Sequence, residues 1–90
     1  MVQDYKEFSS KLITQIGGKN NVADVFHCAT RLRFTLKDIS IAEKNIDLIK
    51  SNKEVLDVIV QNGQFQVVIG PNVSKVFAVI NENLQLNEEV

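Results

Sequence analysis

The sequence is poor in the residues that stabilise small secreted domains or bind metals. Its 90 residues include one cysteine, one histidine, one proline and no tryptophan. A single cysteine cannot form a disulfide within the chain, so a disulfide-stabilised secreted domain is excluded and a reducing, cytoplasmic setting is expected. One histidine and one cysteine are too few ligands for a zinc site, and we expect no metal.

The sequence also lacks an excess of charge and any long apolar run. Ten basic and eleven acidic residues give a formal net charge of −1, so no overall field would hold nucleic acid or an anionic membrane surface. The apolar runs fall far short of the roughly 20 residues needed to span a bilayer, and the first residues lack the apolar segment of a signal peptide. No Gly-rich nucleotide loop is present. We therefore expect a soluble chain without cofactors that binds no nucleic acid and does not itself insert into a membrane.

The first segment has the spacing of an amphipathic helix within an ordinary globular composition of 44% hydrophobic and 23% charged residues. Its apolar residues lie three, four and eight positions apart, which places them on one helix face. They are Tyr5, Phe8, Leu12, Ile13 and Ile16. The pair Gly17-Gly18 predicts the end of this helix.

Two strands are predicted next, over Val22 to His27 and Arg31 to Lys37. The second alternates strictly between apolar and polar residues, which is typical of a strand with one buried face. Its apolar positions are Leu32, Phe34 and Leu36, and its polar positions are Arg31, Arg33, Thr35 and Lys37. One face of this strand is therefore apolar and the other basic.

A second helix is predicted from Ser40 and Glu43, which form a Ser-x-x-Glu capping box at a helix start. Ile46 and Ile49 continue its buried stripe. A last helix is predicted to open at Gly70-Pro71, with the proline at the first helical position. Its apolar stripe consists of Val73, Val76, Phe77 and Ile80.

A hairpin is predicted around Asn62-Gly63, because a type I′ turn needs positive φ at both central residues. Its strands are Val55 to Gln61 and Gln64 to Ile69. A two-residue turn sets three apolar pairs on one face of the hairpin. These pairs are Val60 with Phe65, Val58 with Val67 and Leu56 with Ile69.

The predicted order of elements is therefore α-β-β-α-β-β-α. Two hairpins and three amphipathic helices predict an α+β fold, a four-stranded antiparallel sheet with three helices on one face. We expect one domain over residues 1–84. Residues 85–90 are interpreted as the start of a linker.

The stretch from His27 to Arg33 holds the candidate functional residues. Cys28 lies at a predicted strand-to-strand turn, where backbone N–H groups are free to converge on an anion. Arg31 and Arg33 share a face of the strand, so both guanidinium groups can point the same way, close to the turn. Such cations lower the pKa of a thiol, and the thiolate is the nucleophile. A phosphoryl group on sulfur carries more charge than the free thiolate. It would therefore be held more strongly by the turn amides, the arginines and Thr30.

Each of these residues also has a simpler interpretation. A lone cysteine is most often a small buried hydrophobe, two arginines on a strand are often a solvated face, and Thr30 is a common turn residue. A Cys-x5-Arg phosphatase loop is absent, because the residue six positions after Cys28 is Phe34. Three functions stay open from the residues alone: a phosphocarrier, a phosphate- or nucleic-acid-binding module, and a thiol redox sensor. A nucleic-acid-binding module needs aromatic residues among the basic ones for stacking, whereas the residues between Arg31, Arg33 and Lys37 are expected to point inward. A redox sensor needs a resolving thiol from outside the chain.

The sequence around the cysteine resembles the enzyme IIB domain, of glucose and β-glucoside type, of the bacterial phosphoenolpyruvate-dependent sugar phosphotransferase system. The signature of that family runs from an asparagine through a cysteine and x-Thr-Arg to alternating apolar residues and a closing Asp or Gln. The matching residues are Asn21, Val22, Cys28, Thr30, Arg31, Leu32, Phe34, Leu36 and Asp38. The stretch from Gln64 to Gly70 and the residues flanking the cysteine resemble its β-glucoside, sucrose and trehalose branch.

The resemblance implies a protein-phosphohistidine–sugar phosphotransferase in which Cys28 is the phosphocysteine intermediate. Cys28 would accept a phosphoryl group from a IIA domain and donate it to a sugar held by a membrane IIC domain. Arg31 and Arg33 would be needed for onward transfer, while Ala29, Thr30 and Arg31 would bind the phosphoryl group. His27 would be at most a tuner, because the residue at this position varies in the family. The implied location is the cytoplasmic face of the bacterial membrane, with residues 85–90 leading to IIC.

Overall fold

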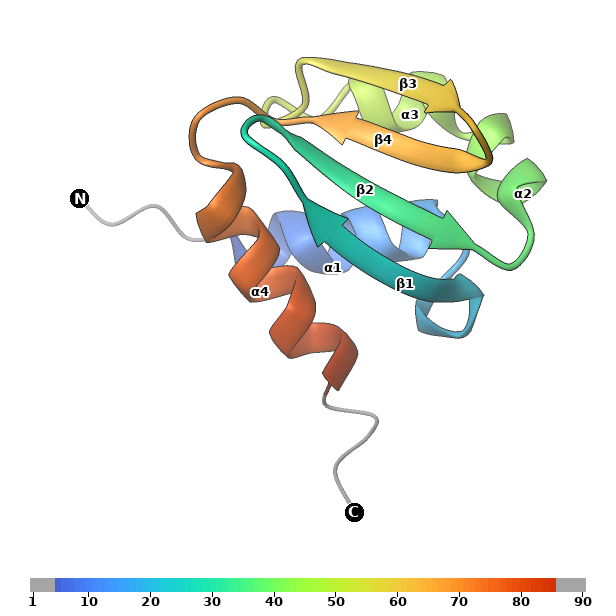
Figure 1. Cartoon of the computed structure of the whole chain (residues 1–90), viewed down its shortest axis with the longest axis horizontal. Helices are drawn as coiled ribbons and strands as arrows, with labels where there is room; N and C mark the ends of the chain where they lie inside the picture. The colour runs from blue at the N-terminus through green and yellow to red at the C-terminus, as the bar shows by residue number, and fades with distance from the viewer. Residues whose placement is uncertain (1–4, 86–90) are drawn as a thin grey trace.

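The chain folds around one twisted antiparallel sheet, seen in the computed structural model, which describes residues 5–85 (Figure 1). The strands follow the spatial order β1-β2-β4-β3, so that β2 and β4 lie at the centre. Their bounds are β1 (Val22–His27), β2 (Arg31–Leu36), β3 (Asp57–Gln61) and β4 (Gln64–Val68).

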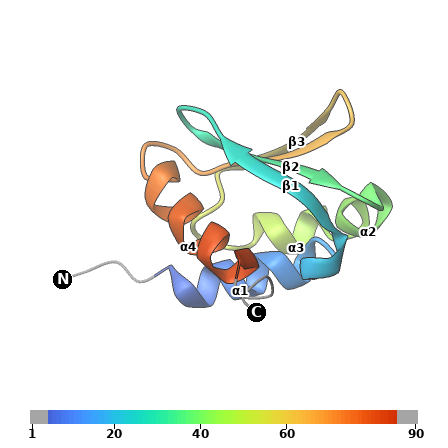
Figure 2. The same cartoon turned by 60° about the horizontal axis from the view of Figure 1, so that its bottom comes forward.

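The helices cover one side of this sheet, and the other side is left open (Figure 2). The helical elements are α1 (Lys6–Gln15), α2 (Ile39–Lys44), α3 (Ile46–Lys50), α4 (Val73–Gln85) and the short 3₁₀ turn η1 (Lys19–Asn21). Helix α1 packs against both α3 and α4. The predicted α+β class and the four-stranded antiparallel sheet are confirmed, but the described residues form four α-helices and not three.

The extra helix arises because the predicted second helix is broken at Asn45. This residue ends α2 and begins α3 with φ −107° and ψ 14°. Its side-chain amide donates to the carbonyl of Gln15 at the end of α1, at 2.8 Å. The break therefore ties the two short helices to α1, a long-range contact that the local apolar spacing does not reveal.

The predicted capping box at Ser40 and Glu43 is wrong. Asp38 is the N-cap of α2, and its carboxylate accepts a hydrogen bond from the backbone N–H of Ser40 at 3.1 Å. The Ser40 hydroxyl donates to the same carboxylate oxygen. The helix therefore begins at Ile39, one residue before the serine that was expected to cap it.

The predicted start of the last helix is also wrong by two residues. Helix α4 begins at Val73, and Pro71 lies in the turn before it. Gly70 turns the chain with φ +102° and accepts from the Val73 N–H at 3.1 Å. The N–H of Val76 then donates to Asn72 at 3.2 Å, so the proline precedes the first helical residue. The helix continues through Gln85, and residues 86–90 of the predicted linker lie outside the described residues.

The predicted hairpin is confirmed except at its open end. Asn62 and Gly63 have φ of 54° and 76°, and Val60 and Val58 lie opposite Phe65 and Val67. The third pair does not form: Leu56 precedes β3 and is 67% exposed.

The core lies between the helices and the inner face of the sheet. The predicted stripe of α1 and the apolar positions of β2 are buried there, as are Phe65 and Val67 of β4 and three stripe residues of α4. Strand alternation sends the polar residues of β2 and β4 to the opposite side. We call this side the open face; its central residues are Arg31, Arg33, Thr35, Gln64, Gln66 and Val68. Between residues 5 and 85 no helix is both long and apolar enough to cross a membrane.

Candidate functional site

The cysteine loop, residues 28–31, joins β1 to β2 in a tight turn. The backbone N–H of Cys28 donates to the carbonyl of Arg31 at 3.0 Å, and the exposed Ala29 and Thr30 form the tip of the turn. The Cys28 side chain is only partly buried. The thiol is therefore held at the end of the β1–β2 hairpin and stays accessible.

The loop is anchored to a distant segment through its third residue. The carbonyl of Thr30 accepts hydrogen bonds from the N–H groups of Ile69 at 2.8 Å and Gly70 at 2.9 Å. The amide of Ile69 thus bonds to Thr30, whereas Ile69 was predicted to pair with Leu56. Gly70 reaches the loop with φ +102°, a backbone conformation that favours glycine. The connection from β4 to α4 thus fixes the position of the loop.

The surroundings of the thiol favour its anionic form. The Arg33 guanidinium and the backbone N–H groups of Thr30 and Arg31 are the groups near the sulfur that favour its anion. These donors, Arg33 foremost, lower the pKa of the Cys28 thiol from an ordinary 9.0 to about 7, against a smaller opposing effect of burial. At neutral pH about half of the molecules would carry the thiolate, which is the nucleophilic form.

The two arginines are held by glutamines of the neighbouring strand. Arg31 Nη1 donates to Gln66 Oε1 at 2.8 Å, and Arg33 Nη1 approaches Gln64 Oε1 at 3.3 Å. The sequence predicts that Gln64 and Gln66 lie in a hairpin strand, but it does not predict that they bind the arginines. Strand alternation places the even-numbered residues of β4 on the open face. That signal is insufficient alone, since the pairing of β2 with β4 is not visible in the sequence.

His27 lies on the other side of the sheet from the arginines. Its ring packs against Phe77 of α4, with the ring centroids 4.7 Å apart. Its Nδ1 lies 3.0 Å from the carbonyl of Cys28, an arrangement that fits an Nδ1–H donor. The structure therefore brings Cys28, Thr30, Arg31 and Arg33 together. The His27 ring contacts only the backbone of the loop, at the Cys28 carbonyl.

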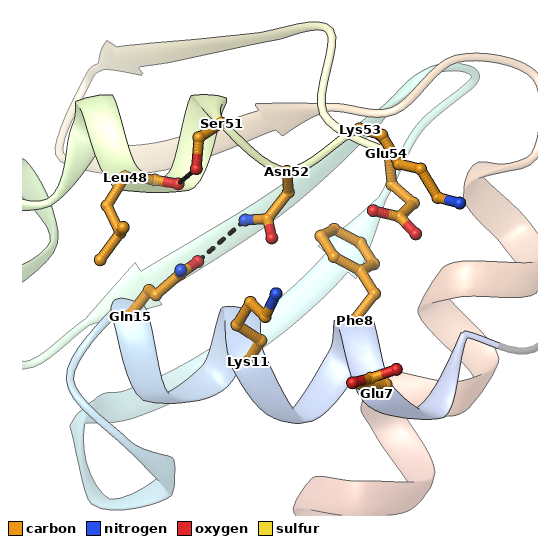
Figure 3. Close-up of a pocket in the computed structure, with 9 residues that line it drawn as sticks. All are labelled: Glu7, Phe8, Lys11, Gln15, Leu48, Ser51, Asn52, Lys53 and Glu54. Carbon is orange, nitrogen blue, oxygen red and sulfur yellow. Dashed lines mark hydrogen bonds between the residues drawn. The ribbon is translucent and has the colours of Figure 1, made fainter.

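A separate groove of about 700 Å³ lies between α1 and the segment that follows α3 (Figure 3). Its lining includes both acidic and basic residues, and contains none of the cysteine loop. The buried amides at its base are bonded to each other, with Asn52 donating to Gln15 at 3.0 Å. These two buried amides therefore have partners within the protein.

Known proteins resemble this chain in sequence and in fold. A sequence model of the phosphotransferase system EIIB family matches residues 10–42, which include the whole cysteine loop. The crystal structure of one domain of the PTS system IIabc component from Clostridium difficile is 35% identical, with a TM-score of 0.80. The match covers 87% of this chain and 80% of that domain's chain.

Two curated relatives extend the comparison. The β-glucoside-specific EIIBCA component of Dickeya chrysanthemi is 42% identical over 74 residues, which is 82% of this chain and 11% of that protein. The sucrose-specific EIIBC component of Bacillus subtilis is 37% identical, over 96% of this chain and 18% of that protein. The chain thus spans less than a fifth of either relative, and what they share with it is one domain. With the cysteine loop inside the matched region and the fold in common, the chain belongs to the EIIB family of the sugar phosphotransferase system, whose members are phosphotransferase components.

Proposed function

We propose that this chain is a phosphocarrier, with Cys28 as the residue that carries the phosphoryl group. The observation that carries the proposal is the set of donors around the sulfur, namely the Arg33 guanidinium and the N–H groups of Thr30 and Arg31. The same donors that favour a thiolate would favour a phosphoryl group on sulfur, which carries more negative charge. Ala29 and Thr30 form the exposed tip that a phosphoryl donor would approach.

The first step is acceptance from a phosphohistidine of a IIA domain. The Cys28 thiolate attacks phosphorus, an S–P bond forms, and the P–N bond of the phosphohistidine breaks with its electron pair leaving on nitrogen. The lowered pKa of the Cys28 thiol, about 7, supplies thiolate at neutral pH. Hydrogen bonds from Thr30 and Arg31 N–H groups would hold the new phosphoryl oxygens.

The second step is donation to a sugar hydroxyl. The hydroxyl oxygen attacks phosphorus, the S–P bond breaks, the Cys28 thiolate leaves, and the hydroxyl proton passes to solvent or to a base of the sugar site. A thiol of low pKa is the better leaving group. Arg31 and Arg33 would stabilise the charge on the transferring group, since both lie on the open face beside the loop.

The partners proposed are a IIA domain as donor and a membrane IIC domain with its sugar as acceptor. The relatives are EIIBCA and EIIBC components, which supports this assignment. Residues 86–90, which follow α4, would begin the linker to IIC, and the domain would work at the cytoplasmic face of the membrane. The sugar classes proposed are β-glucosides, sucrose or trehalose. His27 is assigned a tuning role only, through the Cys28 carbonyl.

The test is incubation with phosphoenolpyruvate, the general phosphotransferase proteins and a cognate IIA, followed by intact and peptide mass spectrometry. We expect one phosphoryl group on Cys28 and none on a Cys28→Ala variant. Because the chain has one cysteine, phosphorylation should also protect the whole protein from alkylation by iodoacetamide. Absence of the phosphoryl group, with IIA shown to be phosphorylated in the same mixture, would reject the carrier role.

A further inference from the structure

The side chains of Gln64 and Gln66 join the two arginines into one hydrogen-bonded chain. Gln66 Oε1 accepts from Arg31 at 2.8 Å, and Gln66 Nε2 donates to Gln64 Oε1 at 3.2 Å. The same Gln64 oxygen lies 3.3 Å from Arg33 Nη1. The hydrogen bonds therefore run from Arg31 to Gln66 and from Gln66 to Gln64. Arg33 donates to the same Gln64 oxygen.

Burial makes the inner member of this chain hard to rearrange. Gln66 is only 3% exposed, so its amide oxygen and nitrogen would each lose free energy without a partner. Its backbone position lies directly opposite Arg33 in the β2–β4 ladder. The arginines are long side chains that would otherwise sample many rotamers. The glutamines on the adjacent strand therefore restrict where both guanidinium groups lie.

The chemical type of the anchor also matters. A guanidinium group has five N–H donors and no acceptor, so it needs an acceptor to be oriented. A carboxylate at position 64 or 66 would orient it more strongly, but would also cancel the positive charge that acts on the sulfur. An amide orients the arginine through a neutral oxygen. The positive charge of the arginine then still acts on the thiolate or the phosphoryl group.

We propose that Gln64 and Gln66 are positioning residues that hold Arg31 and Arg33 at the cysteine loop through neutral hydrogen bonds. Gln64 acts through Arg33, the side chain that most favours the Cys28 thiolate, and Gln66 holds Arg31 and supports Gln64. The consequence for phosphoryl transfer rests on the proposed function. The consequence for the thiol does not, because it concerns the free protein.

The test compares Gln64→Met and Gln64→Glu with the wild-type chain by the pH dependence of Cys28 alkylation. Methionine keeps the length of the side chain and removes its amide, while glutamate adds a charge. We expect the alkylation midpoint to rise in both variants, and further in the glutamate variant. A rise of about one pH unit from 7 would lower the rate at pH 7 about fivefold. His27, the titratable neighbour of Cys28, is retained throughout and so contributes equally to every measurement.

The matched control is Gln61→Met, since Gln61 is exposed and lies opposite Gln64 on the edge strand β3. It should leave the midpoint unchanged. The shift caused by Gln64→Met should vanish in an Arg33→Ala background, because Gln64 acts through that arginine. An unchanged midpoint in both Gln64 variants, or an equal shift with and without Arg33, would overturn the proposal.

A second measurement tests Gln66. Because this residue is buried, a variant that folds poorly could be mistaken for one that has lost function. Gln66→Met, checked for native circular dichroism, should slow phosphoryl transfer from IIA at least about threefold, as expected for loss of one oriented donor. Transfer at the wild-type rate would overturn the role of Gln66. If the wild-type chain takes up no phosphoryl group while the Gln64 variants still shift the midpoint, the proposed function fails and the positioning of Arg33 stands.

Discussion

The side chain of Asn21 forms a two-way hydrogen-bonded bridge with the backbone of Asp38. Its Nδ2 donates to the Asp38 carbonyl at 3.0 Å, and its Oδ1 accepts from the Asp38 N–H at 2.9 Å. The same Nδ2 donates to the carbonyl of Ile16 at 2.8 Å. Asn21 thereby joins the end of α1 to the start of α2 on either side of the β1–β2 hairpin that carries the cysteine loop.

Replacing Asn21 with alanine should destabilise the fold. The side chain is buried, so its loss leaves backbone groups of Ile16 and Asp38 without their partner. We expect the free energy of unfolding to fall by about 2–4 kcal/mol. Urea unfolding followed by circular dichroism measures this, with the exposed neighbour variant Asn20→Ala as control. Equal stability of the two variants would show that the bridge contributes nothing.

Gly17 should tolerate alanine less well than Gly18. Both have positive φ, at 113° and 87°, so both substitutions strain the backbone, at a cost of roughly 1–3 kcal/mol. A Cβ at Gly17 would also lie 2.5 Å from Asn21 Nδ2, whereas one at Gly18 would meet nothing within 4 Å. The free energy of unfolding should therefore fall by at least about 1 kcal/mol more in Gly17→Ala. Similar losses in both variants would contradict the steric part of this explanation.

The cap at Asp38 should make stability depend on pH in the acidic range. Hydrogen bonds from Ser40, through its hydroxyl first and its N–H second, lower the pKa of the Asp38 carboxyl. A group whose pKa is lowered by folding stabilises the protein above its unfolded pKa of about 3.9 and loses this contribution as pH falls through the folded pKa. The stability of the wild-type chain relative to Asp38→Asn should thus be greatest at neutral pH and decrease below about pH 5. Urea midpoints measured from pH 7 to pH 3 test this, and a constant difference would refute it.

Arg33 should control the reactivity of the thiol more than Arg31 does. The Arg33 guanidinium is the largest cause of the lowered pKa of Cys28, whereas Arg31 acts mainly through a backbone N–H that alanine also has. The pKa of Cys28 should therefore rise from about 7 toward 9.0 in Arg33→Ala, and rise less in Arg31→Ala. Alkylation rates as a function of pH give both values. Equal shifts in the two variants would contradict the larger effect of the Arg33 guanidinium on the thiol.

Both arginine variants should slow transfer to sugar while leaving the fold intact. Removal of a cation that stabilises the transferring phosphoryl group is expected to lower the rate about tenfold or more. The free energy of unfolding should change by less than about 1.5 kcal/mol, because both side chains lie on the open face. Sugar phosphorylation with membranes that contain the cognate IIC measures the first effect. Loss of folding in both variants would indicate a structural role instead.

Much of the fold was readable because it depends on short-range chemistry. The alternation in β2 places Arg31 and Arg33 on one face whatever the neighbouring strand is, since the strand period is a property of the backbone. The Asn62-Gly63 turn was predicted for a similar reason, because few residues other than these accept positive φ in succession.

The errors lie where a distant segment decides the local structure. Asn45 breaks a helix whose apolar spacing is continuous, because its side chain bonds to Gln15, 30 positions earlier. Asp38, and not Ser40, caps α2, and the backbone of Asp38 is held by the side chain of Asn21. Leu56 fits the apolar pattern of the hairpin, yet its partner Ile69 donates its amide to Thr30. In each case a contact between distant segments prevailed over a local preference.

By itself the sequence determined the class of the fold, the two hairpins and the residues of the cysteine loop. These follow from periodicity, turn chemistry and motif spacing within a few positions of each residue. The tertiary structure alone decided that β4 lies beside β2, and hence that Gln66 meets Arg31 across 35 positions of the chain. Strand neighbours are chosen by burial over the whole domain, which no local pattern records, so the groups that orient the arginines beside Cys28 became visible only in the folded chain.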